Sequence, residues 1–73
     1  MDTRVANSRL QGDVAQVTVD GTGIRTFEAR TIARKEGARL LGTADVRIQG
    51  AGWVAGNGEN EGKVFGFYEV RAY

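Results

Sequence analysis

The sequence predicts an α+β fold in which a single helix packs on an antiparallel sheet of about four strands, in the order β(β)αβββ. Three observations support this prediction. Segments in which apolar and polar side chains alternate lie on both sides of one helical segment. Glycine-rich stretches separate these segments, as expected for hairpin connections. The length of 73 residues is enough for one domain.

The amino-terminal part predicts a strand preceded by a polar segment. Residues 1–12 contain few large apolar side chains, and we expect either a polar arm or an edge strand there, with residues 13–73 forming the single small α+β domain. Residues 14–19 alternate apolar and polar side chains and include three valines, which predicts a half-buried strand. Two glycines within residues 20–23 end this strand, and residues 24–27 are expected as a short returning strand.

Residues 27–41 are the helix candidate. Thr26 is suited to cap its amino end, and Glu28 lies in the first turn, where the helix dipole favours an anion. The apolar stripe expected to face the sheet contains Ala29, Ile32, Ala33 and Leu40. Gly37 either lies inside the helix, at a cost of about 1 kcal/mol relative to alanine, or ends it one turn early. Gly42 is suited to the left-handed position that follows a helix.

Three strands are expected after the helix. Residues 44–49 alternate cleanly, with Ala44, Val46 and Ile48 on one side and Asp45, Arg47 and Gln49 on the other. The glycines of residues 50–52 are expected to break this strand before a short one at residues 53–55. Residues 56–62 form a glycine-rich acidic connection, and residues 63–73 form a long final strand. Gly66 within it indicates a bulge or a close backbone approach.

The composition excludes several kinds of chemistry. The chain has no cysteine and no histidine, which excludes disulfides, thiolate nucleophiles, histidine-based triads and zinc sites of the usual kind. The glycines at 50, 52 and 56 are not followed by a helix, so they do not form a nucleotide-binding fingerprint. Glu59 and Glu61 lack the spacing of a calcium loop. We therefore expect no enzyme activity, no cofactor and no metal.

The charge is balanced overall but concentrated locally. The chain has 10 basic and 9 acidic residues, and eight of the basic residues are arginines. Residues 25–39 contain five basic and two acidic residues, so the positive charge gathers on the predicted helix. The alternative is an ordinary solvated helix face. The candidate binding residues are Arg30, Arg34, Lys35 and Arg39 on the helix, with Arg47 on the next strand extending the patch toward phosphates or an acidic protein surface.

Several segments resemble a known family. Residues 29–36 follow the pattern A-x-x-I-A-x-K-E, and after a gap near residues 37–41 the pairs Gly42-Thr43, Arg47-Ile48 and Trp53-Val54 follow in order. This arrangement resembles a small anti-CRISPR protein family of phages whose members inhibit the type I-F surveillance complex. The resemblance implies a non-catalytic blocker that docks on a nucleoprotein complex, with Arg30, Lys35 and Arg47 as contact candidates. The glycine-rich loop and the last strand depart from the family pattern.

A second resemblance concerns Lys35-Glu36-Gly37-Ala38, which is similar to the helix end of small enterobacterial envelope domains of βαββ type. Those domains carry signal peptides, whereas the first residues here lack the apolar run of one. No stretch approaches the roughly 20 apolar residues of a membrane span. We therefore expect a cytoplasmic protein, in the host cell if phage-encoded, with no membrane partner.

The leading hypothesis is a small non-enzymatic binding protein from a phage or other mobile element that docks on a larger protein or ribonucleoprotein complex. One alternative is a direct nucleic-acid-binding domain, which we disfavour because most of the aromatic residues are expected in the core. The other is a self-associating structural protein, such as a phage particle component. Its long aromatic last strand would pair edge to edge with a copy of itself to form a homo-oligomer.

Overall fold

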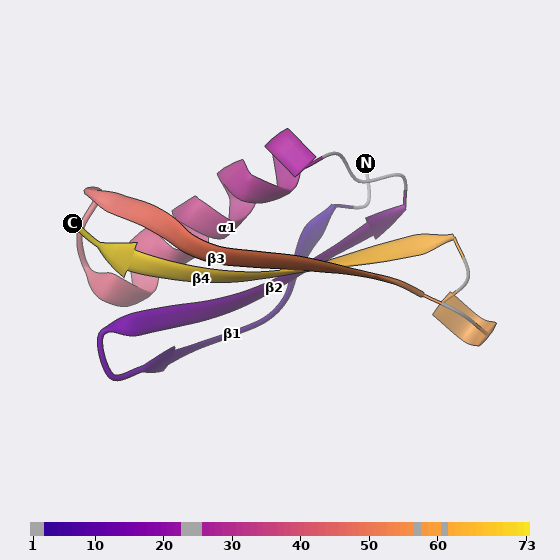
Figure 1. Cartoon of the computed structure of the whole chain (residues 1–73), viewed down its shortest axis with the longest axis horizontal. Coiled ribbons are helices and arrows are strands. Elements are labelled where there is room, and N and C mark those ends of the chain that lie inside the picture. The colour runs from indigo at the N-terminus through magenta and orange to yellow at the C-terminus, as the bar shows by residue number, and fades with distance from the viewer. Residues whose placement is uncertain (1–2, 23–25, 57, 61) are drawn as a thin grey trace.

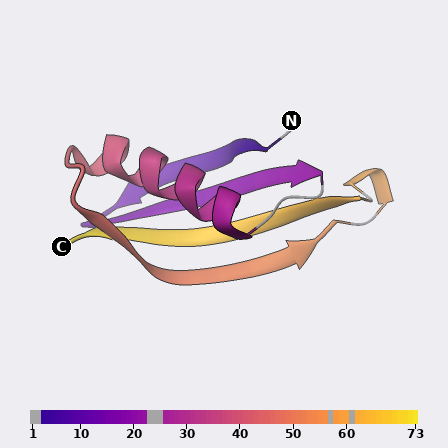
Figure 2. The same ribbon diagram turned by 90° about the horizontal axis from the view of Figure 1, so that it is seen from above.

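The computed structural model describes residues 3–22, 26–56, 58–60 and 62–73 and confirms the predicted fold class (Figure 1). The elements are β1 (Arg4–Gln11), β2 (Val14–Thr22), α1 (Thr26–Leu41), β3 (Val46–Ala55), a short 3-10 helix η1 (Gly58–Asn60) and β4 (Lys63–Ala72). The strands form one antiparallel sheet, and α1 lies across one of its faces. Figure 2 shows the same arrangement from above, with α1 lying over the strands.

The strand order β1-β2-β4-β3 places the last strand in the middle of the sheet. Both β2 and β3 pair with β4 in antiparallel orientation, so they run parallel to each other, and α1 makes the crossover between them. The outer strands are β1 and β3. The segment at residues 1–12 therefore contributes an edge strand. Pairing of two copies along the edge of the last strand is ruled out, because both sides of β4 are already occupied.

The helix passes through Gly37 and ends at Leu41. Gly42 follows with a φ of 74°, and its N–H donates to the carbonyl oxygen of Ala38 at 2.8 Å. This is the left-handed helix end for which glycine is suited. The expected returning strand at residues 24–27 is wrong for Thr26 and Phe27, which begin the helix, whereas residues 24 and 25 lie outside the described residues.

The core consists almost entirely of small side chains between α1 and the sheet. Its buried members are Ala15, Val17 and Val19 of β2, Ala29 and Ala33 of α1, Val46 of β3, and Tyr68 and Val70 of β4. The alternation predicted for β2 is confirmed, and so is the inward stripe of the helix, where Ile32 and Leu40 are partly buried. Small side chains on both layers allow the helix to lie close to the sheet.

Gly37 marks the closest approach between the two layers. It is buried, and a Cβ atom at this position would lie 2.5 Å from Cβ and 2.9 Å from Cγ2 of Val70. Real Cβ atoms do not approach carbon that closely, so a side chain here would push α1 away from β4. The glycine inside the helix is therefore explained by packing.

The two strands expected at residues 44–49 and 53–55 are one strand, β3. The glycines do not interrupt it, because β4 continues alongside and pairs with Gly50, Ala51 and Gly52. The register shifts between Ile48 and Gly50, which leaves Gln49 as the extra residue of a β-bulge. Because side chains alternate between faces, this single extra residue reverses the facing of every later position in β3.

We expect Gly37→Ala to destabilise the domain. Alanine favours the helix by about 1 kcal/mol over glycine. Overpacking against Val70 costs roughly 1–3 kcal/mol. Because the overlap is severe, we expect a cost near the upper end of that range, so the loss exceeds the gain. Urea denaturation measures the free energy of unfolding. The double variant Gly37→Ala/Val70→Ala should lose less unfolding free energy than the two single variants added together, because the smaller side chain at position 70 makes room for the added methyl group. A stabilised single variant would contradict the packing explanation.

Candidate functional site

The five cationic side chains predicted to form one binding surface are separated into three groups. Arg30, Arg34, Lys35 and Arg39 are all exposed on α1, and Arg47 is exposed on β3. An α-helix turns by about 100° per residue, so the four helical side chains point in different directions. Their neighbours in the folded chain decide which of them can act together.

Arg30, Arg34 and Lys35 form the first group, which we call the basic ridge. Arg34 and Lys35 line a groove of about 270 Å³ that α1 forms with Ala44 and Val46. Arg30 precedes Arg34 by one helical turn. No ion pair joins any of the three to a carboxylate in the described part of the chain. Their charges are therefore free for a partner.

Arg39 belongs to a second group, which links α1 to β1. Its Nε and Nη2 donate to the two carboxylate oxygens of Glu36 at 2.8 and 2.7 Å. The hydroxyl of Ser8 on β1 donates to the same carboxylate. The hydrogen bond from Arg39, followed by the one from Ser8, lowers the pKa of Glu36 from 4.5 to about 2, although burial acts in the opposite direction. Arg39 is thus occupied within the domain.

Arg47 is separated from the helix by the sheet. Its neighbours in β3, Val46 and Ile48, pack into the core beneath α1, so Arg47 points to the other face. Its guanidinium carbon lies 5.9 Å from the centre of the Tyr73 ring, a cation–π arrangement. The expectation that Arg47 extends the helical patch is therefore wrong, because strand alternation turns it away from the ridge.

The expectation that most aromatic residues fill the core is also wrong. Of the five aromatic residues from Trp53 onward, only Tyr68 is buried, with 2% of its surface exposed. Phe67 is 45% exposed and Tyr73 is 84% exposed. The thin core explains this result, because a layer of alanines and valines has no room for more rings. The main argument against nucleic-acid binding is thereby removed.

Tyr68 fits because its ring lies along the sheet over Gly66. A Cβ at Gly66 would lie 2.7 Å from Cε2 of Tyr68, so the close approach predicted at this glycine is made by a side chain. Trp53, opposite Gly66, packs edge-on against the Tyr68 ring. The Tyr68 hydroxyl is buried and has no hydrogen-bond partner among the described residues. Burial raises the pKa of Tyr68, and the positive charge of Arg30 partly opposes this.

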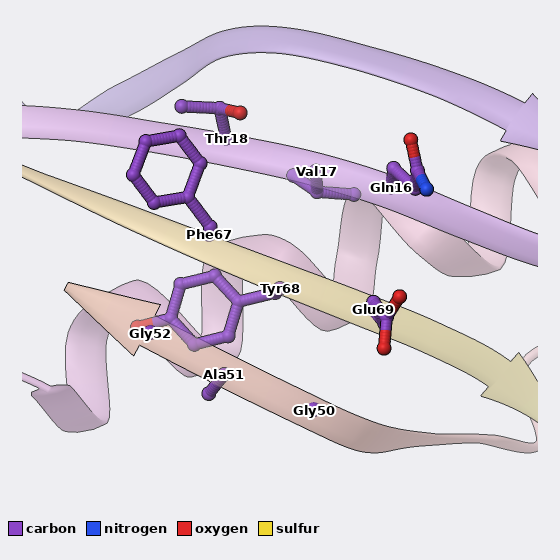
Figure 3. Close-up of a pocket in the computed structure, with 9 residues that line it drawn as sticks. All are labelled: Gln16, Val17, Thr18, Gly50, Ala51, Gly52, Phe67, Tyr68 and Glu69. Atoms are coloured by element: carbon purple, nitrogen blue, oxygen red, sulfur yellow. The ribbon is translucent and has the colours of Figure 1, made fainter.

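The sheet face away from α1, which we call the open face, carries a hollow of about 500 Å³ (Figure 3). Phe67 and Glu69 project from β4 beside Thr18 and Gln16 of β2, whereas β3 contributes only glycines and Ala51. The sequence contained a signal for this face: Phe65, Phe67, Glu69 and Arg71 alternate with the buried Gly66, Tyr68 and Val70. The expectation that most of the aromatic residues lie in the core overlooks this alternation.

Comparisons with known proteins found no matching protein-family model, no matching curated protein and no matching solved structure. Within the described residues, no three acidic side chains gather closely enough to hold a metal ion. Neither α1 nor η1, the helices of the described residues, is long and apolar enough to cross a membrane. The candidate sites therefore rest on the geometry of the basic ridge and of the open face.

The Ser8–Glu36–Arg39 link makes stability depend on pH in acid. In the unfolded chain Glu36 takes up a proton near pH 4.5, whereas in the folded chain it does so only near pH 2. Its contribution is complete above pH 4.5 and is lost as the pH falls to about 2. Glu36→Gln should flatten the decline in unfolding free energy across this window, measured by urea denaturation at a series of pH values. Glu69→Gln is the matched control, and equal slopes in both variants would refute the link.

Proposed function

We propose that this protein is a non-enzymatic binding protein that docks through the basic ridge on an acidic surface of a larger protein or ribonucleoprotein complex. The observation that carries the proposal is that Arg34 and Lys35 border the same groove and that Arg30 precedes Arg34 by one helical turn. All three are exposed and have no ion pair with a described carboxylate. The complex is expected in the cytoplasm of the cell that makes the protein.

The chemistry of the ridge suits this role. Two arginines supply planar guanidinium groups that bind carboxylates or phosphates through two hydrogen bonds, and Lys35 supplies a further positive charge. Cations on an exposed rim speed association with an acidic partner and help to set its orientation. The groove beside them gives such a partner a shaped surface to contact.

The resemblance to inhibitors of the type I-F surveillance complex suggests one specific target. Of the contact candidates that it implies, Arg30 and Lys35 belong to the ridge, whereas Arg47 lies on the open face. A single flat docking surface cannot use all three residues. The ridge is therefore the surface that we assign to this target.

Two other classes of function depend on different surfaces. Nucleic-acid binding is favoured by the exposed Phe67 and the arginines of the open face. Association of two copies along a strand would have to use β1 or β3, since β4 is central. Neither alternative requires the basic ridge, which makes it possible to separate them by mutation.

Neutralising the ridge should weaken docking. We expect the wild-type protein to comigrate with purified type I-F surveillance complex on size exclusion at low salt. The variant Arg30→Gln/Arg34→Gln/Lys35→Gln should bind at least about tenfold more weakly, because it loses three interfacial charges. The control Arg71→Gln removes an arginine that already pairs with Asp13, and it should bind as the wild type does.

A crosslinking experiment tests docking without assuming the target. A photo-crosslinking amino acid at Thr31, which lines the groove, should form a protein adduct in the producing cells. The same probe at Gln11 on β1 should not form that adduct, and the ridge variant should lose it. If the Thr31 probe gives no adduct that depends on the ridge, the proposed function is wrong. If such an adduct contains another protein, only the surveillance complex is rejected as the target.

A further inference from the structure

The open face presents its side chains as a regular grid. Side chains directly opposite each other in paired strands share a face. One row across the sheet therefore contains Arg9, Gln16, Glu69 and Gly50, and the next contains Asn7, Thr18, Phe67 and Gly52. Beyond the first row, Arg47 and Arg71 lie opposite each other. The grid thus has a ring, a carboxylate and several cations on a single surface.

Phe67 provides a flat apolar surface in the middle of this face. It stands on the central strand β4, is 45% exposed, and lies beside Thr18 at the edge of the hollow (Figure 3). Across from it Gly52 has no side chain, and a Cβ added there would meet no atom within 4 Å. One side of the ring is therefore open toward β3. A planar group of the size of a nucleobase can stack there.

Glu69 and Gln16 provide polar groups beside the same hollow. Glu69 leans across Gly50, since a Cβ at Gly50 would lie 2.8 Å from Oε1 of Glu69. The carboxylate therefore lies over the glycine of β3, about 7 Å along the strand from Phe67. Carboxylate oxygens accept hydrogen bonds from the exocyclic amino group of a base such as cytosine. The face thus offers a stacking surface with a hydrogen-bond acceptor beside it.

Cations stand on both sides of the hollow. Arg9 on β1 contacts only the uncharged side chains of Gln16 and Gln11, and Arg47 on β3 packs over Tyr73. Neither forms an ion pair with a described carboxylate, whereas Arg4 pairs with Asp20 and Arg71 with Asp13. The two free cations lie on opposite edge strands, separated by the width of the sheet, about 14 Å. An anionic chain crossing the sheet would meet one of them on each side.

We propose that the open face binds single-stranded nucleic acid, with a base stacked on Phe67, its amino edge toward Glu69 and Gln16, and its flanking phosphates at Arg9 and Arg47. A single strand is required because the bases must be splayed out to reach the sheet, as on other sheet surfaces that stack about two or three bases. This site is distinct from the basic ridge, which lies on the other side of the sheet, so a nucleoprotein could be contacted by both faces.

Fluorescence anisotropy with short single-stranded DNA and RNA oligonucleotides tests the proposal on the full chain. Phe67→Ala should weaken binding by about tenfold, the loss of one stacked base. The control is Phe27→Ala, which removes a ring on α1 that is 82% exposed and lies outside the open face, and it should have no effect. Arg9→Gln and Arg47→Gln should each reduce the slope of log affinity against log salt by about 0.7, whereas Arg34→Gln should leave it unchanged.

Oligo(C) should bind more tightly than oligo(U), and Glu69→Gln should reduce that difference in affinity.

Several results would overturn the proposal. One is the absence of oligonucleotide binding at low salt by folded wild-type protein. Another is binding that depends on Arg34 and Lys35 but not on Phe67, which would assign the nucleic acid to the basic ridge. A third is a dimer in light scattering that Phe67→Ala dissociates, with no oligonucleotide bound, which would show that a second copy covers this face. Because Phe67, Arg9, Arg47 and Glu69 lie outside the ridge, failure here does not affect the docking proposal.

Discussion

The close contact between α1 and the sheet controls the positions of the other side chains. Ala29, Ala33 and Gly37 face the sheet, and Gly37 lies directly against Val70. A layer this thin gains little hydrophobic stabilisation per residue, since burial scales with apolar area. It also leaves no depth for aromatic rings, apart from Tyr68, which lies flat over Gly66. The remaining rings occupy the margins and the open face, where partners can reach them.

Whether an arginine can bind a partner depends on whether a neighbouring carboxylate already pairs with it. Arg39 is held by Glu36, and Arg4 and Arg71 are held by aspartates, so these three contribute to the internal ion pairs of the domain. Only the Arg71–Asp13 pair is exposed on both sides, and such a pair adds little stability. All three pairs remove their cations from any binding surface. Among the described cations without an ion pair, the basic ridge lies on one side of the sheet and Arg9 with Arg47 on the other. The excess of arginine in the composition thus serves more than one surface.

The sequence was sufficient to predict those features of the fold that depend on local patterns. The alternation in β2 and the inward stripe of α1 are confirmed because side-chain burial follows the period of each element. The continuity of β3 was missed because its glycines disfavour a strand, whereas pairing with β4 supplies the hydrogen bonds that maintain it. The site was predicted as one patch of four helical cations extended by Arg47. Which of them act together depends on the position of Glu36 and Ser8, and the open face depends on the bulge at Gln49, neither of which a local pattern reveals.

The central position of β4 has a consequence for the order of events during synthesis. β2 and β3 are not hydrogen-bonded to each other. Each of them pairs with β4, which is synthesised after both. Before β4 is available, α1 can pack only on the β1–β2 hairpin. β3, which follows α1, has no strand to pair with until β4 is present. The domain must therefore assemble late and in one cooperative step, through contacts between residues far apart in the chain. Such non-local topologies fold more slowly than helical ones of equal length.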